Sequence, residues 1–365
     1  MSRNPIESIE AITDKNTGEL GHEPPSKASS GKKKKVLISD IKPVPIKDRS
    51  QQGIVELILD EGTKVQAVGV IYGMRHTLEG DGFKATVFLD HYNQRIRILN
   101  YQAENFNNFI SKVLWLAEAN QFDKLFAIVP RSDWQKFLCH GWVLEAVIKY
   151  YLRGEDAFVV SRFRSQERLT SPSLMEETNL IENIMDGPVK ITDETKPLPT
   201  DFEFRLATHD DLEALANIYQ DIFESYPSPL IYTGYLESLL QGDDIFVVAT
   251  QNGKIQSVAS ASLDPEHLSA ELTDCATRPE ARGKGLMSYI LSILQMELAN
   301  RNYVCAYTMA RARSYGMNNC FYQQGYEFMG RLVNNCDIYG AFEDMNIWVK
   351  NLITGPTQEI DYEIR

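Results

Sequence analysis

The residues from Ala270 to Met287 combine a strand, a basic glycine turn and a helix, which is the layout of an anion-binding site. A strand of mixed apolar and polar residues ends at Pro279, and an amphipathic helix begins near Leu286. Between them, in Arg282-Gly283-Lys284-Gly285, the glycines let the backbone approach a ligand. The first helical N–H groups add the positive end of the helix dipole. With two cationic side chains, the turn suits a pyrophosphate better than a single carboxylate.

This turn does not fit two other phosphate-binding loops. A P-loop needs Gly-x-x-x-x-Gly-Lys-Ser/Thr, and a dinucleotide fingerprint needs three spaced glycines and a later acidic residue. The turn instead resembles the Arg/Gln-x-x-Gly-x-Gly/Ala signature of the GNAT N-acetyltransferases, which bind acetyl-CoA through its pyrophosphate. Arg282 to Gly285 match that signature, and Met287 stands where the family usually has a small residue.

The resemblance implies a set of cofactor contacts. In the family, the pantetheine arm of the cofactor pairs with the strand before the signature. This pairing requires that strand to part from its neighbour, so that its N–H and C=O groups are free. The implied contacts are Cys275, Ala276, Thr277, Arg282, Gly283, Lys284, Gly285, Leu286 and Met287.

Two family positions on the next helix differ in this chain. Counting back from Gly325, the usual cofactor-contacting Asn is replaced by Ser314, and the usual Tyr, which protonates the departing thiolate, is replaced by Phe321. We assign both residues to cofactor contacts, and the usual general acid is therefore absent. Tyr315 and Tyr322 are the candidates to replace it, if the geometry allows.

Acetyl transfer to an amine also needs a base. A lysine-type amine with a pKa of about 10.4 costs about 4 to 5 kcal/mol to deprotonate at pH 7. Glu271 and Asp274 on the cofactor strand are the candidates. Strand residues three apart face opposite sides, so we expect only one to face the acyl group, with Asp274 favoured because it is nearer the thioester. Cys275 would suggest an acyl-enzyme, but we expect it to be a packing residue and transfer to be direct.

Polar residues gather near the ends of the later strands. A diamine that carries a carboxylate would need a cation and acidic or amide groups. We assign these roles to Arg311, Arg313, Asn318, Asn334, Asn335 and Glu343. The runs Ala310 to Asn318, Asn334 to Gly340 and Glu343 to Lys350 resemble one GNAT subfamily, the beta-lysine N6-acetyltransferases, in which Ala-Arg-Ala-x-Ser-x-Gly-Met-Asn and Glu-x-Met-Asn-x-Trp-x-Lys recur.

The resemblance to this subfamily implies a specific reaction. Acetyl would pass from acetyl-CoA to the N6 amine of beta-lysine, giving the compatible solute N6-acetyl-beta-lysine, with a lysine 2,3-aminomutase supplying the substrate. Acetylation removes one positive charge and leaves a net-neutral molecule that can accumulate without disturbing ion balance. Two alternatives stay open: a GNAT enzyme acting on lysine, a polyamine or another small amine, and a CoA-binding protein without catalysis. No metal is expected.

The rest of the chain is predicted to form two related units. Phe137 to Trp142 and Phe321 to Tyr326 share the pattern Phe-x-x-x-Gly-aromatic, each after a strand and a short helix. We interpret this as a degenerate internal repeat. We therefore expect an α/β (α+β mixed sheet) GNAT acyltransferase fold in tandem, with the pyrophosphate turn only in the second unit. The predicted parts are a disordered basic tail (1–50), an amino-terminal GNAT-like unit (51–164), a linker (165–200), the catalytic GNAT domain (201–352) and a tail (353–365).

Composition limits the class and the partners of the protein. With 43% hydrophobic and 24% charged residues and no apolar run of bilayer length, a soluble globular protein is predicted. Five scattered cysteines and the lack of a secretory signal favour the cytoplasm and argue against a zinc site. The net charge of −13 argues against nucleic-acid binding and is compatible with a cationic substrate. The oligomeric state stays open, with a homodimer as one option.

Overall fold

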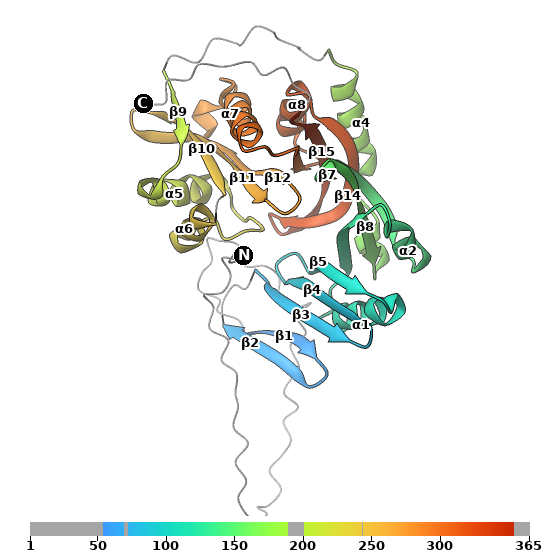
Figure 1. Ribbon diagram of the computed structural model, residues 1–365. Helices are drawn as coiled ribbons and strands as arrows, with labels where there is room; N and C mark the ends of the chain where they lie inside the picture. Colours follow the sequence, from blue (N-terminus) through green and yellow to red (C-terminus); the bar gives the residue numbers. More distant parts are fainter. Residues whose placement is uncertain (1–53, 69–71, 189–200, 243, 354–365) are drawn as a thin grey trace, which may run out of the picture.

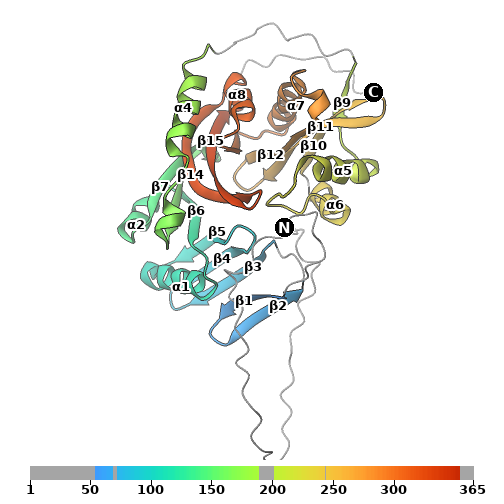
Figure 2. The same cartoon turned by 180° about the vertical axis from the view of Figure 1, so that it is seen from behind.

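The computed structural model describes residues 54–68, 72–188, 201–242 and 244–353. Their main feature is one 13-stranded sheet in the order β3-β4-β5-β6-β8-β7-β14-β15-β13-β12-β11-β10-β9, beside a two-stranded ribbon, β1-β2. Figures 1 and 2 show the amino-terminal strands, in blue and green, at one end of the molecule and the carboxy-terminal strands, in yellow to red, at the other. The predicted tail 1–50, residues 189–200 of the predicted linker and the tail from residue 354 lie outside the described residues.

The first unit packs a helix on one face of its strands. After the ribbon of β1 (Ile54–Asp60) and β2 (Thr63–Val68), α1 covers the sheet with Phe109, Val113 and Leu116, which recur at helical spacing and are fully buried. The other elements of this unit are β3 (Met74–Gly80), β4 (Phe83–Asp90), β5 (Arg95–Ala103), α1 (Phe106–Ala119), β6 (Lys124–Pro130), α2 (Trp134–Cys139), β7 (Val143–Leu152) and β8 (Glu155–Phe163).

The second unit has helices on both faces of its strands. On β10, Val247 packs in the core under α7, and its neighbour Val248 packs in the core under α5 and α6, so the strand is apolar on both sides. The elements are β9 (Glu203–Leu206), α5 (Leu212–Ile222), α6 (Thr233–Gln241), β10 (Ile245–Gln251), β11 (Lys254–Asp264), β12 (Ser269–Thr277), α7 (Leu286–Asn300), β13 (Cys305–Arg311), α8 (Tyr315–Gln323), β14 (Glu327–Ile338) and β15 (Ala341–Asn351).

The strand pairing repeats between the two units. β5 lies parallel to β6, which pairs antiparallel with β8, and β8 pairs antiparallel with β7. β12, β13, β15 and β14 pair in the same way. In both units the Phe of the shared sequence pattern, Phe137 or Phe321, is buried, and the Gly, Gly141 or Gly325, has a positive φ. The predicted mixed α/β sheet is confirmed, and β5 of the first unit is the topological counterpart of β12.

The two units meet where β7 lies beside β14. The two strands share one registered pair, Gly330 with Ala146. Lys124 of the first unit is fully buried and binds Glu145 at 2.9 Å, and it also donates to the carbonyl of Val333 in the second unit at 2.8 Å. Apolar residues of both units form a common core behind this contact. The sheet therefore continues from one unit into the other.

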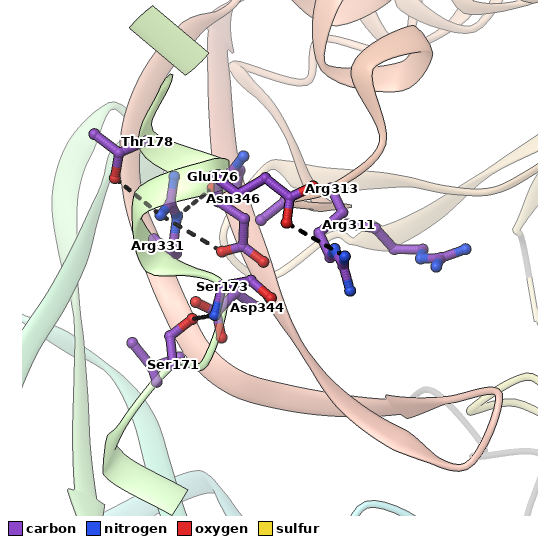
Figure 3. A network of polar contacts seen from close by, with 12 residues as sticks. Ser171, Ser173, Glu176, Thr178, Arg311, Arg313, Arg331, Asp344 and Asn346 are labelled. Carbon is purple, nitrogen blue, oxygen red and sulfur yellow. Dashed lines mark hydrogen bonds and ion pairs between the residues drawn. The ribbon is translucent and has the colours of Figure 1, made fainter. Parts of the chain in front are cut away.

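The segment that was predicted to be a linker contains two helices, α3 (Gln166–Leu169) and α4 (Leu174–Met185). Figure 3 shows α4 beside β14, where Arg331 binds Asn346 at 2.9 Å and reaches Thr178 at 3.5 Å. Arg331 also lies 3.5 Å from Glu177, which is buried. Ser173 is the N-cap from which α4 begins.

One strand of the first unit was not predicted. β3 is an edge strand in which only Leu78 is buried. Because the other side chains of β3 are exposed or partly exposed, the sequence lacks the apolar alternation by which strands are recognised.

Gly330 tests the joint between the units. Its φ is +138°, and a Cβ there would lie 2.4 Å from the carbonyl oxygen of Glu145 and 2.6 Å from the Cα of Ala146. We expect Gly330→Ala to lower the free energy of unfolding by about 2–4 kcal/mol, measured by urea denaturation. The control is Gly340→Ala, where φ is +78° and nothing lies within 4 Å, so a loss of about 1 kcal/mol is expected. Equal losses would contradict this account of the joint.

Candidate functional site

β12 parts from its parallel neighbour after three residue pairs. Residues 269–271 pair with residues 305–307 of β13. Farther along, the registered pairs of β12 are with β11 alone and those of β13 are with β15 alone. The edge of β12 that faces β13 is therefore left without a partner strand from residue 272 to 277. A cofactor arm that pairs with Cys275, Ala276 and Thr277 requires such an unpaired strand edge.

The basic turn that follows β12 is open to solvent. Gly283 and Gly285 have φ of 77° and 78°, and a Cβ at either position would have no neighbour within 4 Å. Gly285 is the N-cap of the 15-residue helix α7, so the first N–H groups of that helix face the turn. Arg282 and Lys284 are exposed, and the Nε of Arg282 donates to the carbonyl of Thr277 at 3.1 Å. The turn has the backbone geometry and the charge of an anion site.

A bulge in β12 changes the direction of Asp274. This residue has a φ of +53°, and together with Cys275 it lies opposite the single residue Ala259 of β11. Unbroken alternation would place Glu271 and Asp274 on opposite faces of β12, and this expectation is wrong because of the bulge. Asp274 accepts a hydrogen bond from Ser260, whose side chain is on the face of Glu271, and the charge of Asp274 raises the pKa of Glu271.

Both carboxyl groups have raised pKa values. For Asp274, burial raises the pKa, although the hydroxyls of Ser260 (2.8 Å) and Tyr226 (3.0 Å) donate to its oxygens and oppose the shift. For Glu271, burial again raises the pKa, the positive charge of Arg97 opposes it, and the hydroxyl of Tyr307 donates at 3.5 Å. A carboxylate with a raised pKa is a stronger base, so both groups are suited to accept a proton from an ammonium ion.

The first unit contributes side chains to the surroundings of Glu271 and Asp274. The ring of Tyr151, on β7, lies 5.5 Å from the ring of Tyr307 on β13. Arg97, on β5, lies close enough to lower the pKa values of Tyr151, Tyr307 and Glu271 against the effect of burial. Burial raises the pKa of Tyr235, on α6, and Asp274 lies close enough for its carboxylate to raise that pKa further. We name the whole set the carboxylate–tyrosine cluster; its members are Arg97, Tyr151, Tyr226, Tyr235, Glu271, Asp274 and Tyr307.

The members from the first unit, Arg97 and Tyr151, were not predicted, because the motifs that indicate the site all lie in the second unit. One signal was present in the strand Arg95-Ile96-Arg97-Ile98. Its two isoleucines lie in the core of the first unit. Its two arginines therefore face the opposite side of the sheet, where both lie over the ring of Phe126. Arginines on the face that is turned away from the first unit's core indicate that polar partners for them lie outside that core.

The two tyrosines predicted to replace the general acid differ in their surroundings. The hydroxyl of Tyr322 donates to the carbonyls of Met185 (2.9 Å) and Gly187 (3.1 Å), so it ties α8 to the segment after α4. Tyr315, the first residue of α8, is 56% exposed. The geometry therefore favours Tyr315 over Tyr322 as a proton donor.

The other predicted cofactor residues surround the starts of α7 and α8. Leu286 is buried and Met287 is partly buried in the core under α7. Phe321 is buried in the same core, and Ser314 is the N-cap of α8. Cys275 is also packed there, and burial raises the pKa of its thiol well above the ordinary value. The thiol is therefore protonated, which fits the expectation of a packing residue.

Two predicted cations of the acceptor site are already paired. Arg311 binds Glu343 through two hydrogen bonds of 2.7 and 2.6 Å. Arg313 lies 3.3 Å from Glu176 at the exposed end of α4, as Figure 3 shows. We therefore do not propose Arg311, Arg313 or Glu343 as ligands of a substrate.

Three predicted acceptor amides hold the fold together instead. Asn318 is fully buried, donates to the carbonyls of Arg311 (2.8 Å) and Ser314 (2.7 Å), and accepts from Asn346 and Trp348. Asn334 donates to three carbonyls of α3 and its flanks. Asn335 is buried at the joint, where its carbonyl accepts from Arg95. The amide of Asn318 is fully used and the Asn334 Nδ2 is used by the fold, so neither group is free to bind a substrate. The Oδ1 of Asn335 is buried and makes no hydrogen bond.

Potential metal ligands are dispersed in the part of the chain that the structure describes. No three His, Cys, Asp or Glu side chains there are arranged to hold an ion. In the same residues, no helix is both long enough and apolar enough to cross a bilayer.

Comparison with known proteins bears on this geometry. The model of the Acetyltransferase (GNAT) family matches residues 212–326, which include β12, the basic turn and α7. N-acetyltransferase YodP of Bacillus subtilis is 31% identical over 279 residues, covering 76% of this chain and 100% of that protein. A beta-lysine N(6)-acetyltransferase of Methanosarcina mazei is 33% identical over 255 residues, covering 65% of this chain and 94% of that protein. A beta-lysine N(6)-acetyltransferase of Methanococcus maripaludis is 30% identical over 258 residues, covering 71% of this chain and 93% of that protein.

Gly285→Glu tests the anion site. A carboxylate at the N-cap of α7 would occupy the place of a bound diphosphate and repel it, so we expect the Kd of coenzyme A to rise at least about 100-fold in calorimetry. The control is Gly253→Glu in the β10–β11 turn, where φ is +74° and nothing lies within 4 Å. The Gly253→Glu variant has the same backbone strain at a place remote from the basic turn, so its Kd for coenzyme A should equal that of wild type. If Gly285→Glu bound coenzyme A as tightly as wild type, the basic turn would not be part of the cofactor site.

Asp274→Asn separates activity from stability. We expect kcat/KM to fall at least about 100-fold, because a base is lost. Burial raises the pKa of Asp274 in the folded protein, so its ionisation opposes folding as pH rises through that pKa. Asn tolerates a positive φ and carries no charge. The variant should therefore be at least as stable as wild type in thermal melts. Its gain in stability over wild type should be larger at pH 8 than at pH 5. A larger loss of stability at pH 8 would contradict the assignment.

Proposed function

This chain belongs to the GNAT acetyltransferase family and is an N-acetyltransferase that uses acetyl-CoA, and we propose that it acetylates the N6 amine of beta-lysine. The product would be N6-acetyl-beta-lysine, a net-neutral compatible solute, and a lysine 2,3-aminomutase would supply the substrate. Two relatives that are named beta-lysine N(6)-acetyltransferase, at 33% and 30% identity, support the proposal. So do the three runs that resemble the subfamily, from Ala310 to Lys350.

The observation that carries the proposal is the pair of carboxylates on one face of β12. Because of the bulge, Glu271 and Asp274 are directed to the same cluster, where burial raises both pKa values. Beta-lysine has two ammonium groups and one carboxylate at neutral pH. Two adjacent carboxylates match two ammonium groups in charge, and one of them can also take the proton that must leave before the amine attacks.

The reaction then follows from the positions along β12. The diphosphate of acetyl-CoA would bind at the turn from Arg282 to Gly285, and the pantetheine arm would pair with the free edge of residues 275–277. This order directs the thioester toward Asp274. Asp274 would accept the proton of the N6 ammonium, and the neutral amine would attack the thioester carbon. The acetyl group would pass to nitrogen, which gives up a second proton to solvent, as the thiolate leaves. Phe321 cannot protonate that thiolate, so we assign this step to Tyr315.

Acceptor specificity tests the proposal. We expect release of the CoA thiol with beta-lysine at a kcat/KM at least about tenfold above that with lysine or spermidine. Mass spectrometry and NMR should place the acetyl group on N6 rather than on the 3-amine. Faster turnover of lysine or spermidine would reject beta-lysine as the substrate and leave the family assignment in place.

A further inference from the structure

Arg97 is a cation without a polar partner. Its Nε is buried and makes no hydrogen bond. Among the described residues it takes part in no ion pair, and the contact it does make is with the ring of Phe126, 5.6 Å from the guanidinium carbon. A buried charged donor without an acceptor opposes folding. Because Arg97 is only partly buried, water or a ligand can reach its guanidinium, and a ligand carboxylate would supply the acceptor that its Nε lacks.

Three other arginines of this region have carboxylate partners. Arg95, two residues earlier on β5, binds Asp90 at 2.7 Å. Arg311 on β13 binds Glu343, and Arg278 after β12 binds Asp221, each at 2.6 Å. The unpaired state of Arg97 is thus a local feature of the carboxylate–tyrosine cluster. It also leaves Arg97 available for the role that the sequence analysis assigned to Arg311 and Arg313.

Packing places Arg97 near the carboxylate–tyrosine cluster: the ring of Phe126, over which it lies, belongs to the same core as Tyr307, and Tyr151 packs against that core. Tyr151 and Tyr307 contact each other ring to ring, and the hydroxyl of Tyr307 donates to Glu271. Arg97 acts electrostatically on all three of these groups and on Tyr235. It nevertheless forms no ion pair with Glu271. A positive group and a negative group therefore share one cluster without neutralising each other by direct contact.

We propose that Arg97 binds the carboxylate of the acceptor, so that the first unit selects a diamino acid over a plain polyamine. Guanidinium is suited to this role because its N–H groups match the two oxygens of a carboxylate. The inference rests on the proposed function, because it assumes an acceptor that has both amines and a carboxylate.

The order of groups along β12 fixes the orientation of such an acceptor. Glu271 comes three residues before Asp274, at most about 10 Å away in an extended strand. Tyr307 and Tyr151 connect Glu271 to the first unit, whereas Asp274 lies in the bulge next to residues 275–277. The acceptor carboxylate and its 3-amine would lie near Arg97 and Glu271. The N6 amine would then reach Asp274 and the thioester.

The test compares acceptors that differ only at the carboxylate. These are beta-lysine, its carboxamide and pentane-1,4-diamine, each assayed by thiol release with the full-length protein. We expect wild type to prefer beta-lysine over the carboxamide by about 30-fold or more in kcat/KM. Arg97→Met should lose this preference, mostly through KM for beta-lysine, and keep its rate on the carboxamide. Arg97→Lys should retain part of the preference, because the charge remains and the fork is lost.

Two controls separate binding from folding. Arg301→Met removes an exposed arginine at the end of α7 that lies 3.6 Å from Glu297, and it should leave all three acceptors unchanged. The affinity of Arg97→Met for coenzyme A should equal that of wild type in calorimetry, because Arg97 lies outside the anion turn.

Several outcomes would overturn the proposal. One is equal loss of activity by Arg97→Met on beta-lysine and on its carboxamide, and another is equal use of both by wild type. If wild type uses lysine instead of beta-lysine, the proposed substrate fails, but lysine and pentane-1,5-diamine then give the same test of Arg97. An enzyme that uses spermidine alone overturns both the proposed function and the role of Arg97.

Discussion

The site depends on the separation of two parallel strands. After residue 271, β12 keeps β11 as a neighbour but no longer pairs with β13. Backbone N–H and C=O groups left in this way must find other partners, and an extended chain with amide groups of its own can supply them. The same separation directs the end of β12 into the basic turn and α7. A sheet that stayed paired over the whole of β12 would have neither the free edge nor room for a cofactor arm.

The first unit has the same strand order, but the end of its β5 is not followed by a basic glycine turn. Residues 95–98 of β5 pair with residues 124–127 of β6, and the strands pair no farther. Here the ring of Tyr101 stacks on Phe109 at 5.1 Å, and its hydroxyl donates to Asp133 at 2.8 Å. In place of a glycine turn, Asn105 caps α1 through its own side chain. Aromatic side chains and a cap stand where the second unit has its basic turn, and we propose that the first unit instead supplies Arg97 and Tyr151 to the acceptor side.

The sequence predicted the elements better than it predicted the acceptor site. The strand, turn and helix from Ala270 onward lie where periodicity and glycine placed them, because these signals are local. The direction of Asp274 could not be predicted, because a bulge reverses alternation and leaves no mark in composition. Asn318 on α8 and Asn334 on β14 were assigned to a substrate because a polar residue in such a run can serve the fold or a ligand. Only its hydrogen bonds distinguish the two. Arg97 comes from a unit that is more than 100 residues away in sequence from β12.

A crystal structure of the protein with a bisubstrate conjugate, in which the sulfur of coenzyme A is joined to N6 of beta-lysine, is the most direct measurement. The account predicts the diphosphate at the turn from Arg282 to Gly285, the arm paired with residues 275–277 and the sulfur beside Asp274. The beta-lysine carboxylate should lie on Arg97. An arm that runs elsewhere, or a diphosphate that does not touch this turn, would contradict the account.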